Sequence, residues 1–115
     1  MGLMALRSVD SATAVTELGR AVEARPDDYL ARVLAGQVLL ARRAYPEAIE
    51  HLRRATELEP FAAQGRLLLA QAGEAAGDTT SAAADYERYL ALASREDPNV
   101  ALARRRVAAL RSTAH

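Results

Sequence analysis

Apolar side chains recur every three or four positions in short stretches separated by polar breaks, a spacing typical of amphipathic helices. The clearest stripe is formed by Ile49, Leu52, Ala55 and Leu58, and the positions between them are largely charged. The pattern predicts a short helical stub at 2–7 and full helices at about 11–25, 30–42, 61–76, 80–94 and 99–112, with a further helix that begins at the break Tyr45-Pro46 and is stopped by Pro60.

Residues at the breaks support these limits. Asp27 and Asp28 follow Pro26 and are candidate N-caps, because a carboxylate accepts hydrogen bonds from free helix N–H groups and suits the positive end of the helix. Pro46 is well placed in the first turn of a helix, whereas Pro60 ends the helix before it. The breaks therefore predict helical hairpins joined by short turns.

The helices repeat with a fixed period, which equals the distance from Pro26 to Pro60, and four further series keep this spacing. These series are Ala14, Ala48 and Ala82; Leu18, Leu52 and Tyr86; Gly2, Gly36 and Ala70; and Ala21, Ala55 and Tyr89. The distance from Pro60 to Pro98 exceeds the period by four residues, and we expect these extra residues, within 91–97, to add about one helical turn. A fixed period of about 34 residues predicts a repeat architecture.

Composition agrees with an all-α fold. Alanine fills 27 of the 115 positions, whereas the β-branched and aromatic residues that strands favour are few. The absence of cysteine excludes disulfides and cysteine zinc sites, and it is compatible with the cytoplasmic location that we expect. No apolar run approaches the roughly 20 residues of a membrane span, so we expect no membrane partner. All 15 basic residues are arginine, a bias that suggests a GC-rich bacterial genome.

A helix–turn–helix period of this length with small residues in the first helix, alanines in the second and a closing proline resembles the tetratricopeptide repeat (TPR) family. The matching residues are Gly36, Ala48, Leu52, Ala55 and Pro60 in the central repeat, Ala70, Gly77, Ala82 and Tyr86 in the third, and Ala14, Leu18, Ala21 and Pro26 in the first. The sequence departs from the family pattern in two respects. Arg32, Arg66 and Arg104 stand where tryptophan is common, and Tyr89 stands where a small residue is usual.

The resemblance implies an all-α, right-handed α-solenoid of antiparallel helix hairpins. The implied units are a partial first repeat at 1–28, full repeats at 29–62 and 63–97, the second with about four extra residues at its end, and a C-terminal capping helix at 98–112. Helices approach to the short end of the range of about 8–10 Å only where side chains are small. We therefore expect Gly36 and Ala48 to face each other across the central hairpin.

Residues suited to catalysis or metal binding are sparse. The chain has no lysine, no glycine-rich phosphate loop and only two histidines, of which His115 is the last residue. Glu47 and His51 share a helix face at i, i+4 spacing, but no further ligand is evident, and such pairs are common on solvated helices. We therefore expect no enzyme activity, no metal site and no cofactor.

Charge is distributed unevenly along the chain. All acids lie at or before Asp97, so residues 1–97 carry a net charge of −4 and residues 98–115 carry +4, with Arg104, Arg105 and Arg106 in one run. A basic end is compatible with nucleic-acid binding, but it has no aromatic residue for base stacking, and late arginines also suit the negative end of a helix. Nucleic acid is therefore a disfavoured partner, and head-to-tail association of copies is an alternative use of this charge.

By resemblance, the first helices of successive repeats line a concave binding surface. The residues expected on that surface are Leu30, Val33, Gln37, Leu40, Gln64, Leu67, Gln71 and Glu74. This mixture of apolar and amide groups suits an extended segment or a helix of a protein partner, although some of the apolar residues could instead pack between repeats. Some relatives grip a terminal carboxylate with lysine, arginine and asparagine, which are absent from these positions.

The sequence therefore predicts a non-catalytic protein-interaction module or scaffold. The alternative is a self-assembling homo-oligomer, because the partial first repeat would leave one side of the helix at 11–25 uncovered. An uncovered end is also expected if the chain is a piece of a longer repeat array.

Overall fold

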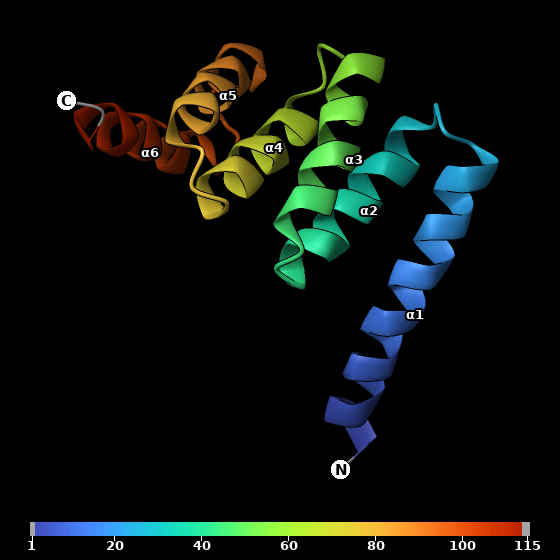
Figure 1. The fold of residues 1–115 in the computed structure, drawn as a ribbon. Coiled ribbons are helices and arrows are strands. Elements are labelled where there is room, and N and C mark those ends of the chain that lie inside the picture. Colours follow the sequence, from blue (N-terminus) through green and yellow to red (C-terminus); the bar gives the residue numbers. More distant parts are fainter. Residues whose placement is uncertain (1, 114–115) are drawn as a thin grey trace.

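The computed structural model describes the backbone of residues 2–113 and the side chains of residues 12–112. Within these residues the fold is all-α, and consecutive helices pack against each other in chain order (Figure 1). The helices are α1 (Gly2–Ala24), α2 (Tyr29–Ala41), α3 (Tyr45–Leu58), α4 (Ala63–Ala75), α5 (Thr79–Leu92) and α6 (Val100–Thr113). Their order forms two complete hairpins, α2–α3 and α4–α5, with α1 before them and α6 after them.

Residues outside the helices set several of these limits. Asp28 is the N-cap of α2, and its carboxylate accepts a hydrogen bond from the N–H of Ala31 at 3.1 Å. Asp78 caps α5 in the same way, through the N–H of Ser81 at 3.2 Å. Pro46 lies in the first turn of α3, where its missing N–H costs no helical hydrogen bond. The predicted cap at Asp28 and the predicted place of Pro46 are confirmed.

The helix α4 receives its cap from another repeat. Its N-cap residue, Ala62, makes no side-chain hydrogen bond. Instead, the hydroxyl of Tyr29 at the start of α2 accepts a hydrogen bond from the N–H of Gly65 at 3.2 Å. A β-carbon at Gly65 would lie 3.3 Å from that hydroxyl, so a glycine gives the phenol room. Tyr29 therefore supplies to α4 the acceptor that a side chain at Ala62 cannot supply.

The prediction of a stub separated from the second helix of the first repeat is wrong. The backbone of α1 continues as one helix from Gly2 to Ala24. The stretch between the two predicted elements, Ser8-Val9-Asp10, contains neither proline nor glycine, so nothing in it interrupts the helix. The helix α1 is consequently longer than the others and extends past α2 and α3 (Figure 1).

The extra residues near Pro98 also differ from expectation. They do not add a helical turn, because α5 and α3 each have 14 residues. Three of them lengthen the connection instead, which runs over 93–99 between α5 and α6 but only over 59–62 between α3 and α4, and α6 begins one residue closer to its proline than α4 does. Tyr89, the enlarged member of its column, is fully buried beside this connection. Burial raises the pKa of its phenol, and the carboxylate of Asp97 raises it further.

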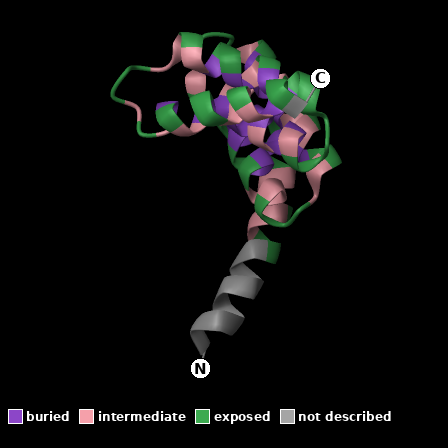
Figure 2. Cartoon of the chain, turned by 90° about the vertical axis from the view of Figure 1, so that its left-hand side faces the viewer, coloured by how far each residue is buried: buried purple, intermediate pink, exposed green. Residues whose placement is uncertain are grey.

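Buried residues lie between the helices throughout the part of the chain whose side chains the structure describes (Figure 2). Those between α2, α3 and α4 form one cluster, made of Val33, Ala48, Leu52, Ala55, Leu68, Leu69 and Ala72. The side-chain atoms nearest to Gly36 belong to Leu52, one turn after Ala48 on α3, and the contact of Gly36 with Ala48 stays a prediction. A β-carbon at Gly36 would overlap the branched end of Leu52, so a residue without a side chain is required there.

Candidate functional site

The surface predicted to bind a partner is exposed in part. Leu30 and Leu34 on α2 are 61% and 38% exposed, which is high for large apolar side chains. Gln37 is exposed on the same side of α2, because residues three and four apart share a helix face. On α4, Gln64 is exposed and Gln71 is half-buried, and these positions follow Leu30 and Gln37 by one repeat period. We call these five residues the α2–α4 face.

Three other predicted residues contribute less to this face. Val33 is 4% exposed and Leu67 is 3% exposed, so both belong to the core and offer no surface to a partner. Leu40 is half-buried and packs against the cluster that contains Val33. The helical spacing of these residues indicates that they share one side of a helix, but it does not tell whether that side faces a groove or packs against the next repeat. Leu34 was not predicted, although it lies one turn after Leu30 and is exposed.

Glu74 is part of a polar link between three helices. Its carboxylate accepts a hydrogen bond from the Tyr86 hydroxyl of α5 at 2.9 Å and pairs with Arg106 of α6. The hydrogen bond from Arg106 lowers the pKa of the Glu74 carboxyl group, and the bond from Tyr86 acts in the same direction. These contacts give Glu74 a role in holding α6 against the α4–α5 hairpin.

The C-terminal arginines are divided between ion pairs and solvent. Arg106 pairs with Glu74, and Arg111 pairs with Glu87 of α5. Arg104 and Arg105 are exposed. Fewer arginines near the C-terminal end are therefore available to an acidic partner than the sequence alone indicates.

A second polar arrangement recurs in both hairpins. In the α4–α5 hairpin, Arg66 pairs with Asp85 at 3.2 Å. Burial raises the pKa of the Asp85 carboxyl group, and the nearby guanidinium only partly opposes this effect. In the α2–α3 hairpin the equivalent residues are Arg32 and His51, and Arg32 donates a hydrogen bond to Nδ1 of His51 at 3.0 Å. The first hairpin thus has a histidine where the second has an acid.

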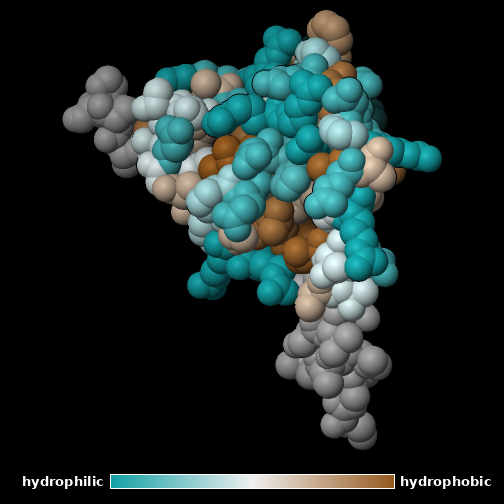
Figure 3. Space-filling view, turned by 45° about the vertical axis from the view of Figure 1, so that its right-hand side comes forward, coloured by the Kyte–Doolittle hydropathy of each residue, from teal (hydrophilic) through white to brown (hydrophobic). Residues whose placement is uncertain are grey.

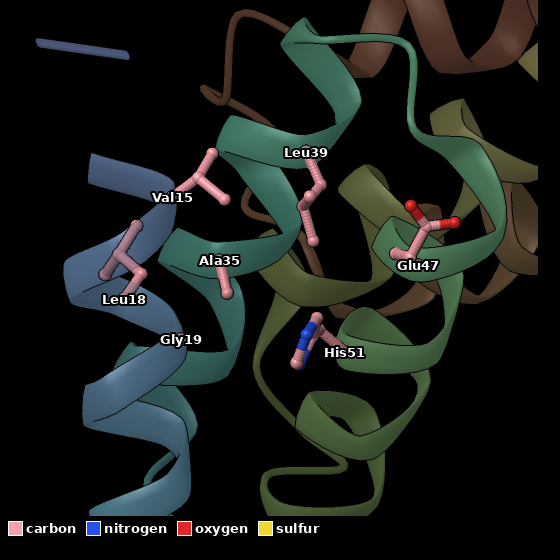
Figure 4. A pocket seen from close by; sticks show the side chains of 7 residues that line it. All are labelled: Val15, Leu18, Gly19, Ala35, Leu39, Glu47 and His51. Atoms are coloured by element: carbon pink, nitrogen blue, oxygen red, sulfur yellow. The ribbon is translucent and has the colours of Figure 1, made fainter. Parts of the chain in front are cut away.

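Glu47 and His51 both line a hollow between α1, α2 and α3 (Figure 4). Among the residues whose side chains the structure describes, no group of three or more His, Cys, Asp or Glu residues is placed to hold a metal ion. Within the same part of the chain, no helix is long and apolar enough to cross a membrane.

Comparisons with known proteins give a family from the sequence and a matching fold from a solved structure. The sequence model of the tetratricopeptide repeat matches residues 1–61 and 45–101. Among solved structures, the TPR domain of Arabidopsis OM64 superimposes with a TM-score of 0.79, over 96% of this chain and 88% of that one. The two sequences are 18% identical, so this likeness shows the fold alone. No curated protein matches the sequence.

Proposed function

The chain belongs to the tetratricopeptide repeat family, and we propose that it is a non-catalytic module that binds a segment of a protein partner on the α2–α4 face. Domains of this family are generally protein–protein interaction modules. The observation that carries the proposal is the exposure of Leu30 and Leu34 on one side of α2. Exposed leucines one turn apart lose their contact with water when a partner covers them, and this burial favours binding.

The composition of the face indicates the kind of segment that would bind. Leu30 and Leu34 supply apolar contacts, whereas Gln37, Gln64 and Gln71 supply amide groups that both donate and accept hydrogen bonds. An amphipathic helix or an extended segment with apolar side chains at one end matches this arrangement. The face carries no charged side chain, so we expect binding that depends weakly on salt.

The proposal is tested by Leu30→Glu and Leu34→Glu, followed by co-purification from the native host. We expect each charge to reduce the recovery of partners about tenfold or more, because an apolar contact is replaced by a carboxylate that must be desolvated. Phe61→Glu is the matched control, since Phe61 is 79% exposed but lies in the connection between α3 and α4. Equal recovery with all three folded variants would show that the α2–α4 face is not the binding surface.

Self-assembly is the second candidate function. Among the described contacts α1 packs mainly against α2, so we expect the other side of the described part of α1 to be available to another copy or to a partner. Against a charge-driven assembly, Arg106 and Arg111 are already paired within the chain. Sedimentation over a hundredfold range of concentration separates the two candidates, because only self-assembly raises the mass with concentration.

A further inference from the structure

The hollow between α1, α2 and α3 has a volume of about 190 Å³. The residues that line it are Val15, Leu18 and Gly19 of α1, Ala35 and Leu39 of α2, and Glu47 and His51 of α3 (Figure 4). Aliphatic side chains form the walls on α1 and α2, and the two polar side chains come from α3. Apolar surface is visible beside the described part of α1 in the space-filling view (Figure 3). The hollow is therefore an apolar site with polar groups on one side.

This hollow is separate from the α2–α4 face. Successive residues of a helix are rotated by about 100°, which places Ala35 and Leu39 on the side of α2 opposite Leu30 and Gln37. A ligand in the hollow would therefore contact α1 and α3, and it would leave the α2–α4 face free.

The corresponding place in the next hairpin is filled. Ala35 corresponds to Leu69, one repeat period later, and Leu69 is 6% exposed within the cluster that contains Leu52. On the opposite wall, a β-carbon at Gly19 would meet no atom within 4 Å. The hollow exists because two small residues, Ala35 and Gly19, stand on its two sides. The repeat geometry by itself does not require it.

The polar groups of the hollow have a defined hydrogen-bonding character. A guanidinium only donates, so Nδ1 of His51 accepts from Arg32 and the ring carries its proton on Nε2. Arg32 also donates to the carbonyl of Pro26 at 2.9 Å. Burial, followed by the charge of Arg32, lowers the pKa of His51 and favours this neutral ring. Glu47 forms no hydrogen bond or ion pair with any residue that the structure describes, and its carboxylate remains available to a cation.

We propose that the hollow binds an apolar side chain of a protein partner in which a basic residue is adjacent to that side chain. The apolar side chain enters between Val15, Leu18 and Leu39, and its basic neighbour pairs with Glu47. A carbonyl of the partner accepts the hydrogen bond that Nε2 of His51 can donate. Charge favours this partner because Glu47 is unpaired among the described residues, whereas the nearby cation Arg32 is bound to His51 and Pro26.

The test is an NMR titration of the ¹⁵N-labelled full chain with two blocked dipeptides. N-acetyl-leucyl-arginine amide should give saturable shifts of the backbone amides of the residues that line the hollow. N-acetyl-leucyl-glutamate amide should bind about two- to fivefold more weakly, as expected for one solvent-exposed ion pair exchanged for a like charge. In the Glu47→Gln variant the two dipeptides should bind with equal affinity, because both still place their leucine in the hollow.

Two variants fill the hollow from opposite walls, so that failure of one to fold does not remove the test. Ala35→Leu places there the side chain that Leu69 provides in the next hairpin, and Gly19→Leu enters from α1. Each variant should weaken the binding of the arginine dipeptide about tenfold or more. Leu30→Ala, on the other side of α2, should leave its affinity unchanged, which separates this site from the α2–α4 face.

Four results would overturn the proposal. They are the absence of saturable shifts at the lining residues, unchanged binding in both filled variants, equal binding of the two dipeptides to the unmodified chain, and movement of the same amides on dilution without peptide. The last result would assign the hollow to a second copy of the chain.

Discussion

The α2–α3 and α4–α5 hairpins share one backbone plan, since each helix of the second begins one repeat period after its counterpart in the first. They differ in the side chains at equivalent positions. The first has Ala35 and an open hollow, whereas the second has Leu69 and a filled one. The repeat thus fixes where the helices lie, while single residues decide which groove remains open to a partner.

The turns inside the two hairpins differ in the same manner. Arg43 has a φ angle of 62°, and its counterpart Gly77 has a φ angle of 89°. This left-handed region suits glycine, whereas a residue with a β-carbon is strained in it. The first hairpin therefore holds its turn at a cost that the second does not have.

The strongest test of the comparison removes the residue that fills the second groove. Leu69→Ala should lower the free energy of unfolding by about 2–5 kcal/mol, because it removes buried contacts and leaves a cavity. Urea denaturation measures the loss. The reciprocal Ala35→Leu should cost about 1 kcal/mol or less, because it adds volume where a hollow already exists. Similar losses in the two variants would contradict the difference between the grooves.

Equivalent positions that hold the same residue in both hairpins should lose similar stability when they are enlarged. Ala48 and Ala82 are both fully buried, and a β-carbon at Gly73 of α4 would lie 3.7 Å from that of Ala82. Ala48→Leu and Ala82→Leu should each overpack a helix contact and cost about 1–3 kcal/mol, seen as a lower melting temperature. An unchanged melting temperature in either variant would show that the small column does not set the approach of the helices.

Substitutions in the two hairpin turns should change the stability of the fold in opposite directions. Gly77→Ala places a β-carbon in the left-handed region and should cost about 1–2 kcal/mol. Arg43→Gly relieves that strain, but it also makes the unfolded chain more flexible, so we expect a gain of at most about 1 kcal/mol. Thermal unfolding of both variants provides the measurement. A loss of stability in Arg43→Gly would indicate that contacts of the arginine outweigh the strain.

The smallest expected effect concerns pH. The pKa of His51 is lowered from 6.5 by burial and by Arg32, so the unfolded chain binds a proton at this site more readily than the folded chain. Stability should therefore fall as the pH is lowered through 6.5, until the folded histidine is also protonated. Urea midpoints between about pH 7.5 and 5 should fall less in His51→Gln than in the unmodified chain. Equal slopes would show that burial and Arg32 do not lower the pKa of His51 in the folded chain. His115 is present in both proteins, so it does not contribute to the difference between them.

Most of the fold could be predicted from the sequence, because local signals and the repeat agree. Asp28, Pro46 and the periodic columns indicated the hairpins and the all-α repeat fold. The continuous helix α1 was missed because Ser8-Val9-Asp10 lie one repeat period before the turn at Arg42-Arg43-Ala44, so the repeat implies a turn that the residues themselves do not form, since no helix breaker is present. The extra residues near Pro98 were assigned to a helix because spacing gives a number of residues and not their conformation.

The candidate sites were less accessible to sequence reasoning. Leu30 and Val33 are three residues apart on one helix and both are apolar, yet one is exposed and the other is in the core. That difference in exposure depends on how α3 and α4 are placed beside α2. The periodicity along α2 alone does not reveal this placement. The hollow is defined by missing volume at Gly19 and Ala35, and missing volume becomes visible only when three helices are assembled.

The hydrogen bond from Gly65 to Tyr29 has a consequence for folding. Asp28 and Asp78 lie next to the helices that they cap, so α2 and α5 can form their first turns from local contacts. The helix α4 takes its acceptor from 36 residues earlier in the chain, and it gains this contact only after α2 is in place. This bond makes the stability of one hairpin conditional on its neighbour, which is the coupling that lets a linear array unfold as a cooperative unit.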